Sequence, residues 1–153
     1  MNIKRTRSIR ITRPGRRMAA AAGLLAISAA TVVAIPGTAS AATVAYNGAC
    51  GSGYNVKSWF GIQSTTEEVT VYLTYSAATG KNCVVGIKDN QTTTRSITVY
   101  IERDDTPGSR VTDSGNYTKY AGPVYIYAKG ACVTWGGVFN DLEVLRRHTN
   151  CGA

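Results

Sequence analysis

The stretch EVTVYLTY at residues 68–75 has the alternation of an extended chain. Every second residue from Val69 to Tyr75 is apolar, and threonine occupies two of the three positions between them. Successive side chains of a β-strand point to opposite faces, so this pattern predicts a strand with one face toward a core. Valine, threonine and tyrosine also suit a pleated, half-buried surface.

Similar segments recur through the rest of the chain, and residues typical of turns separate them. Nothing after residue 41 has a convincing helical period. The sequence therefore predicts an all-β fold, an antiparallel β-sandwich or small barrel of about seven to eight short strands. The further strands are expected at residues 54–62, 82–89, 96–103, 124–128, 131–135 and 142–147, with turns at 79–82, 89–90, 104–108, 122–123, 129–130 and 136–137.

The strongest hairpin prediction falls on Lys129-Gly130, because only these two residues separate two predicted strands. Tyr125 and Tyr127 share one face of the first of these strands. A two-residue turn would place Val133 and Trp135 across from this region.

The motif DSGNY at residues 113–117 resembles the tyrosine corner of immunoglobulin domains, in which a disulfide cysteine follows two residues after the tyrosine. Lys119 occupies that position here, so the immunoglobulin interpretation fails. Asp113, Ser114 and Gly115 are instead predicted to form a turn that delivers Tyr117 to the sheet, with the tyrosine hydroxyl bonded to nearby backbone.

Residues 1–41 have the pattern of a secretory signal peptide. Seven Lys and Arg residues precede an apolar run from Met18 to about Ile35, and Ala39-Ser40-Ala41 provides a cleavage site before Ala42. A transmembrane anchor is the alternative, but the run is rich in Ala, Ser and Thr. We expect residues 42–153 to form a single secreted β domain with no stable membrane anchor after the signal is removed.

Removal of the signal also changes the meaning of the net charge. The whole chain carries +8, but seven of its seventeen basic residues lie in the signal and all nine acidic residues lie outside it. The remaining ten basic residues leave a net charge of +1. A nucleic-acid partner, which would require a basic surface, is therefore not expected.

The four cysteines, Cys50, Cys83, Cys132 and Cys151, all follow the signal. An even number in an exported chain predicts two disulfides, each adding roughly 3 kcal/mol of stability. Three pairings are open, and we favour Cys50–Cys83 with Cys132–Cys151 because each closes a short segment. None has the spacing of a zinc or redox motif, so no metal is predicted.

Several segments together resemble the spore-associated protein A family of streptomycetes and their relatives. The resemblance covers most of residues 42–153 and is weakest from about residue 136 to 150. It implies a small actinobacterial protein of the spore or aerial-hypha surface, with no established enzymatic activity and no catalytic residue or cofactor to carry over. The segments are CGSGYNV (50–56), VYLTYSAATGKNCVV (71–85), DSGNYTKYAGPV (113–124), GACVTW (130–135) and the terminal Cys-Gly (151–152).

Aromatic residues are the candidate binding groups, since nine tyrosines and two tryptophans follow the signal. Tyr125, Tyr127 and Trp135 form the candidate surface site, because a row of exposed rings is a usual platform for sugars or an interface. The alternative, which the general burial of aromatic residues favours, is that these rings fill a core layer.

No catalytic site is predicted. His148 is the only histidine, and no nucleophile motif accompanies it, so it is expected to be an exposed loop residue. The carboxylate pairs Glu67-Glu68 and Asp104-Asp105 could bind calcium or serve glycoside hydrolysis, but adjacent strand residues point to opposite faces and the second pair begins a turn, so a solvated turn is expected rather than a site.

The sequence thus predicts a non-enzymatic secreted protein with a structural or adhesive role, whose partners are spore or cell-wall surface components. One alternative is a surface-polysaccharide-binding module that uses the aromatic residues. A secreted inhibitor or antagonistic toxin is the second alternative, and an uncharacterised secreted hydrolase ranks last.

Overall fold

The computed structural model describes residues 44–153, all within one compact unit of the chain. They form eight β-strands and no helix, so none of them forms a helix that could span a membrane. The predicted signal peptide and its cleavage site lie outside the described residues. The strands are β1 (Asn55–Gln63), β2 (Glu68–Ser76), β3 (Lys81–Lys88), β4 (Arg95–Arg103), β5 (Val111–Tyr117), β6 (Tyr120–Tyr127), β7 (Val133–Phe139) and β8 (Leu142–Thr149).

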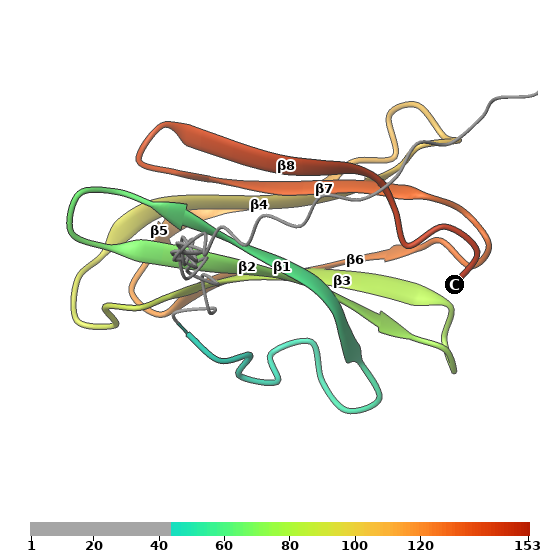
Figure 1. Cartoon of the computed structure of the whole chain (residues 1–153), viewed down its shortest axis with the longest axis horizontal. Helices are drawn as coiled ribbons and strands as arrows, with labels where there is room; N and C mark the ends of the chain where they lie inside the picture. The colour runs from blue at the N-terminus through green and yellow to red at the C-terminus, as the bar shows by residue number, and fades with distance from the viewer. Residues whose placement is uncertain (1–43) are drawn as a thin grey trace, which may run out of the picture. The chain divides into compact units, whose positions relative to one another are not determined.

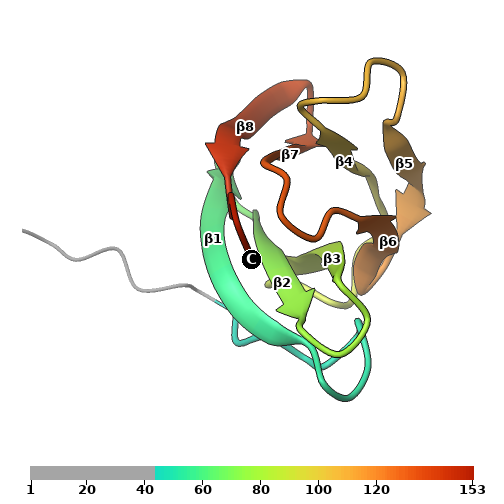
Figure 2. The ribbon, with the colours of Figure 1, turned by 90° about the vertical axis from the view of Figure 1, so that its right-hand side faces the viewer.

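The strands form two four-stranded antiparallel sheets that pack face to face (Figure 1). We call them sheet A, with the order β1-β2-β3-β6, and sheet B, with the order β5-β4-β7-β8. Viewed along the strands, β1 lies beside β8 and β5 beside β6 (Figure 2). The all-β prediction is confirmed, and the two separate hydrogen-bonded sheets identify the fold as a sandwich.

Both faces of the central strand β2 are buried, and the two faces contact different neighbours. Val69, Val71 and Leu73 point between the sheets and join the main core with side chains of β4 and β7 such as Val99 and Phe139. Sixteen buried residues make up this core, and apolar burial of this kind is the main source of stability in such a domain.

The opposite face of sheet A is covered by the segment before β1, residues 44–54, which we call the lead-in. Tyr72, Val85 and Ile87 form a second small core with lead-in side chains that include Val44 and Tyr46. The Tyr72 hydroxyl donates to the Val44 carbonyl. This cover explains why β2 and β3 are buried on both faces although β2 alternates threonine with apolar residues.

The prediction of a hairpin at Lys129-Gly130 is wrong. β6 belongs to sheet A and β7 to sheet B, so Trp135 does not pair across from Tyr125 and Tyr127. The amide of Ala128 donates to the Gly80 carbonyl of sheet A. A few residues on, the Cys132 carbonyl accepts from the amide of Asp104, which follows β4 of sheet B. The turn therefore carries the chain between the sheets.

The turn predicted at Asp113–Gly115 is a strand instead. Asp113, Ser114 and Gly115 lie in β5 and pair with Val99, Thr98 and Ile97 of β4. The Tyr117 hydroxyl donates to Asp113 Oδ1 at 2.6 Å rather than to backbone, and the other carboxylate oxygen accepts from the amide of Gly122 on β6 at 2.6 Å. The motif therefore ties the edges of the two sheets together.

Two other predicted turns also lie inside strands, Gly122-Pro123 in β6 and Gly136-Gly137 in β7. A Cβ atom at Gly136 would lie 2.5 Å from the Tyr100 hydroxyl oxygen and 2.8 Å from the Val144 carbonyl oxygen. This contact is too close for any side chain. Glycine at this position makes room for Tyr100 rather than forming a turn.

Candidate functional site

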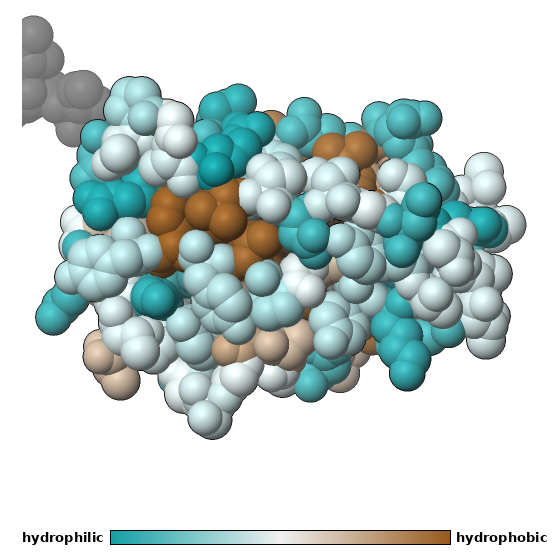
Figure 3. Space-filling model, turned by 180° about the vertical axis from the view of Figure 1, so that it is seen from behind, coloured by the Kyte–Doolittle hydropathy of each residue, from teal (hydrophilic) through white to brown (hydrophobic). Residues whose placement is uncertain are grey.

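Exposed large hydrophobic side chains are concentrated on β6, which carries three of the seven among the described residues. These three are Tyr120, Tyr125 and Tyr127, exposed by 38, 37 and 52%. The remaining four are spread over three strands, β1, β5 and β8. Figure 3 shows the side of the molecule turned away in Figure 1, where a hydrophobic patch interrupts a mostly polar surface; tyrosine is slightly hydrophilic on this colour scale, so the patch does not mark the tyrosines. Because it carries three of the seven exposed side chains, the edge strand β6 is the first place to look for a binding surface.

Tyr125 and Tyr127 lie on the face of β6 that points away from the main core, since Val124 and Ile126 contact that core. The interpretation of these two rings as core residues is therefore wrong. Tyr125 pairs with Cys83 and Tyr127 with Lys81 in the register between β6 and β3. We call Tyr54, Tyr125 and Tyr127 the tyrosine face.

Tyr125 is held in place by the lead-in. Its hydroxyl donates to the Cys50 carbonyl at 3.1 Å, and its ring meets that of Tyr54 edge to face at 5.6 Å between centroids. Partial burial raises the pKa of Tyr125, and the neighbouring Tyr54 adds to the shift. The ring therefore presents a fixed surface rather than a freely rotating side chain.

Sequence analysis missed Tyr54, because only the strand register shows where it lies. Cys83 pairs with Tyr125 and is also bonded to Cys50, so this disulfide brings Tyr54, four residues after Cys50, to Tyr125.

Tyr127 packs over the turn between β2 and β3. A Cβ atom at Gly80 would lie 2.7 Å from Tyr127 Cε2, and Gly80 has a φ of +67°, which favours glycine. The turn that precedes β3 is thus shaped to receive this ring.

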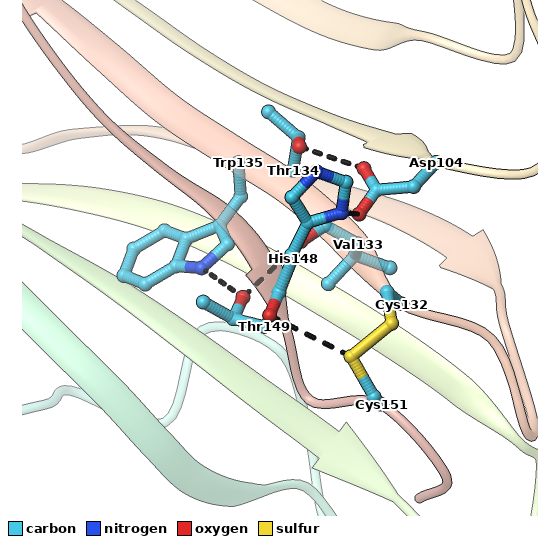
Figure 4. Close-up of a disulfide and its surroundings, with 8 residues drawn as sticks. All are labelled: Asp104, Cys132, Val133, Thr134, Trp135, His148, Thr149 and Cys151. Atoms are coloured by element: carbon cyan, nitrogen blue, oxygen red, sulfur yellow. Dashed lines mark hydrogen bonds and ion pairs between the residues drawn. A yellow bond between two sulfur atoms is a disulfide. The ribbon is translucent and has the colours of Figure 1, made fainter.

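Trp135, the third predicted binding residue, is in the core and cannot contribute to a surface. Its exposed fraction is 0%, and its indole stacks on Phe60 with centroids 4.8 Å apart. The indole nitrogen donates to the Thr149 hydroxyl at 2.9 Å (Figure 4). Placement of Trp135 beside the two tyrosines depended on the hairpin at Lys129-Gly130, which does not form.

The four cysteines pair as predicted, and the two disulfides differ in exposure. The N-terminal disulfide, Cys50–Cys83, is buried, with 3 and 0% of its two residues exposed. In the C-terminal disulfide, Cys132–Cys151, Cys132 is half-buried and Cys151 is exposed. All four sulfurs are oxidised, so no cysteine is available as a nucleophile or metal ligand.

His148 lies at the end of β8 beside the C-terminal disulfide (Figure 4). Its Nδ1 lies 2.8 Å from Asp104 Oδ2, an ion-pair distance without the alignment of a hydrogen bond. Asp104 Oδ1 accepts from the Thr134 hydroxyl at 2.7 Å. The imidazole is 76% exposed and the residue has a φ of +51°, an uncommon value for a residue with a side chain.

This arrangement orients the histidine but supplies no reacting partner. The hydroxyl of Thr134 bonds to the carboxylate rather than to the imidazole. His148 was predicted in a loop, and the structure places it on a strand end with its ring largely in solvent. Within residues 44–153, no three His, Cys, Asp or Glu side chains are grouped so that they could hold a metal ion.

The fold and these residues define a class, a small all-β protein with two sheets, two disulfides and an exposed tyrosine face. No protein-family model and no solved structure matches the chain. The chain is 47% identical over 131 residues to spore-associated protein A of Streptomyces coelicolor, an alignment that covers 84% of this chain and 82% of that protein. The chain therefore belongs to the spore-associated protein A family.

Proposed function

We propose that this protein is a non-enzymatic, secreted component of the spore or cell surface, with a structural or adhesive role. The observation that carries the proposal is the 47% identity to a protein named for its association with spores. The two disulfides support it, because such bonds persist in oxidising environments outside the cytosol. The predicted signal peptide supports export as well.

Fractionation tests this function directly. Spores, aerial hyphae, vegetative cells and culture supernatant would be separated and probed with an antibody against residues 44–153. We expect the protein in the spore or hyphal wash and in the supernatant, with the N-terminal segment removed. Protein confined to the interior of vegetative cells would refute the proposal.

A second candidate is binding of a surface polysaccharide through the tyrosine face, which the exposure and fixed orientation of Tyr125 favour. Aromatic rings stack on the apolar faces of sugars while their hydroxyls remain in water. Retention on insoluble peptidoglycan and on chitin would be measured for the wild type and for Tyr127→Ala and Tyr125→Phe. Tyr120→Ala is the matched control, an exposed tyrosine of the same strand.

We expect wild-type retention on at least one of the two glycans, loss with Tyr127→Ala, and little change with Tyr120→Ala. Wild type that passes through both glycans would end this candidate. A secreted inhibitor is tested separately, because unchanged protease activity at stoichiometric excess of this protein would exclude it.

A further inference from the structure

An open polar depression lies where hairpins of the two sheets meet. It has a volume of about 770 Å³ and is lined by the hairpin between β1 and β2, the first residue of β4, and the turn between β7 and β8. Ligand sites commonly fall within a range of about 300 to 1,000 Å³. The β1–β2 hairpin is at the opposite end of sheet A from Lys81, which pairs with Tyr127. The depression is therefore separate from the tyrosine face.

The floor of the depression is fixed by a buried ion cluster. Glu67 has a side chain that is only 4% exposed, and its carboxylate accepts from Arg95 Nε at 2.5 Å and from the Thr93 hydroxyl. Lys88, whose side chain is fully buried, places its ammonium 3.9 Å from Glu67 and donates to Thr93 Oγ1 at 2.9 Å. The hydrogen bond that Glu67 accepts from the Thr93 hydroxyl is the largest cause that lowers its pKa, and the bond from Arg95 is the next.

Arg95 is thereby oriented toward the depression. Its Nε is bonded to Glu67 and its Nη1 to the Thr94 carbonyl at 3.3 Å, while 42% of the side chain is exposed. Nη2 has no hydrogen-bond partner within residues 44–153. A guanidinium held by two bonds and open at its third nitrogen loses little conformational freedom when it donates to a ligand.

The other polar side chains of the lining are unengaged. Two amides and three hydroxyls surround Arg95, and among the described residues none of the five makes a side-chain hydrogen bond with the protein. Leu142, 51% exposed, adds an apolar surface beside them. The five are Gln63, Ser64, Thr65, Thr66 and Asn140.

The balance of charge identifies the class of ligand. Two cations, Arg95 and the buried Lys88, are matched by two carboxylates, Glu67 and Asp89, so an anion would find no excess of positive charge here. A cation would find only the Glu67 carboxylate, which Arg95 and Thr93 already occupy. What remains is a set of neutral donors and acceptors around an apolar side chain, and this set matches the hydroxyls and carbon faces of a sugar.

We propose that this depression binds a neutral oligosaccharide, with the open Arg95 nitrogen and the amides of Gln63 and Asn140 as donors and Leu142 against a sugar face. For a protein of the spore or cell surface, as proposed above, this site would determine the class of ligand that it binds there. The proposal does not depend on whether the tyrosine face binds glycan.

The test uses soluble neutral probes, N-acetylchitohexaose and cellohexaose, with a hexamer of galacturonic acid as the charged comparison. Binding is followed by amide chemical shifts of the isotopically labelled domain, residues 42–153. We expect shifts at residues 63–67, 95 and 140–142 with at least one neutral probe. Absence of shifts there with both neutral probes, or a response only to the acidic hexamer, would overturn the proposal.

Variants separate this site from the tyrosine face. Gln63→Ala combined with Asn140→Gly removes two amides, and glycine tolerates the φ of +48° at position 140. We expect an affinity about tenfold weaker, from two lost hydrogen bonds, and an unchanged melting temperature. Tyr127→Ala is the control and should leave the shifts at 63–67 intact. Equal loss with Tyr127→Ala, or none with the double variant, would contradict the assignment.

Discussion

Removal of the Asp113 carboxylate should lower the free energy of unfolding more than a substitution at any exposed position of the same strand. One oxygen accepts from the Tyr117 hydroxyl and the other from the Gly122 amide, each at 2.6 Å. The bond from Gly122 joins β6 of sheet A to β5 of sheet B, whereas the bond from Tyr117 lies within β5 and orients the carboxylate. Together they fasten one open side of the sandwich near the turn between these strands.

The magnitude follows from the two bonds. A hydrogen bond to a charged group contributes about 1.5 to 3 kcal/mol, and these are partly buried, so we expect Asp113→Ala to cost about 3 kcal/mol. At about 4 °C per kcal/mol for a domain of this size, the melting temperature should fall by about 12 °C. Tyr117→Phe removes only one bond and should cost about 1.5 kcal/mol.

Urea unfolding followed by tyrosine fluorescence would measure these changes as shifts of the midpoint at constant slope. Asn116→Ala is the matched control, because Asn116 is an exposed residue of β5 between the two bonded positions. It should change stability by less than about 0.5 kcal/mol. The double variant Asp113→Ala/Tyr117→Phe should cost less than the sum of the single changes. A loss below about 1 kcal/mol for Asp113→Ala would refute the reasoning.

Three further outcomes are expected. Burial and carboxylate contacts raise the pKa of several tyrosines, so their protonated forms stabilise the fold below a pH of about 10, and this stability is lost as the pH rises further. Phenolate absorbance should show ionisation that continues well above pH 10, and a single step completed near pH 10 would contradict this; the groups with a raised pKa are Tyr72, Tyr100, Tyr117 and Tyr125. Mild dithiothreitol should open the C-terminal disulfide before the N-terminal one, because a thiolate can reach only the exposed sulfur; peptide mass mapping that finds the reverse order would refute this. Glu67→Gln should cost about 3 kcal/mol in urea unfolding, because it leaves the buried Lys88 without its counter-charge, whereas a loss under about 1 kcal/mol would show that Lys88 is uncharged in the wild type.

Strands in which apolar and polar residues alternate could be predicted from the sequence, but the edge strand β5 could not. EVTVYLTY corresponds to β2 within one residue, because its apolar positions face the main core. β5, by contrast, is exposed or half-buried throughout, so no apolar alternation marks it. Asp113 and Gly115 also have the composition of a turn, although one serves as a hydrogen-bond acceptor between sheets and the other sits against the Tyr117 ring.

The candidate site was predicted only in part, because its geometry depends on which strands share a sheet. Two residues that alternate on one strand must lie on the same face, so Tyr125 and Tyr127 follow from local pattern alone. Trp135 was added through a supposed hairpin, and a two-residue gap does not reveal that the chain changes sheets there. The residues of the polar depression are also separated in sequence, and no local pattern joins Gln63 to Asn140.

The N-terminal disulfide and the tyrosine face act as one structural unit. Cys50 contributes its sulfur to Cys83 and its carbonyl oxygen to the Tyr125 hydroxyl, so a single residue fixes both the lead-in and the exposed ring. Tyr54, four residues further along the lead-in, then meets that ring edge to face. A ligand that stacks on prearranged rings has little conformational entropy to overcome. Opening this disulfide should therefore weaken any binding by the tyrosine face, while the polar depression at the opposite end of the sheet keeps its geometry.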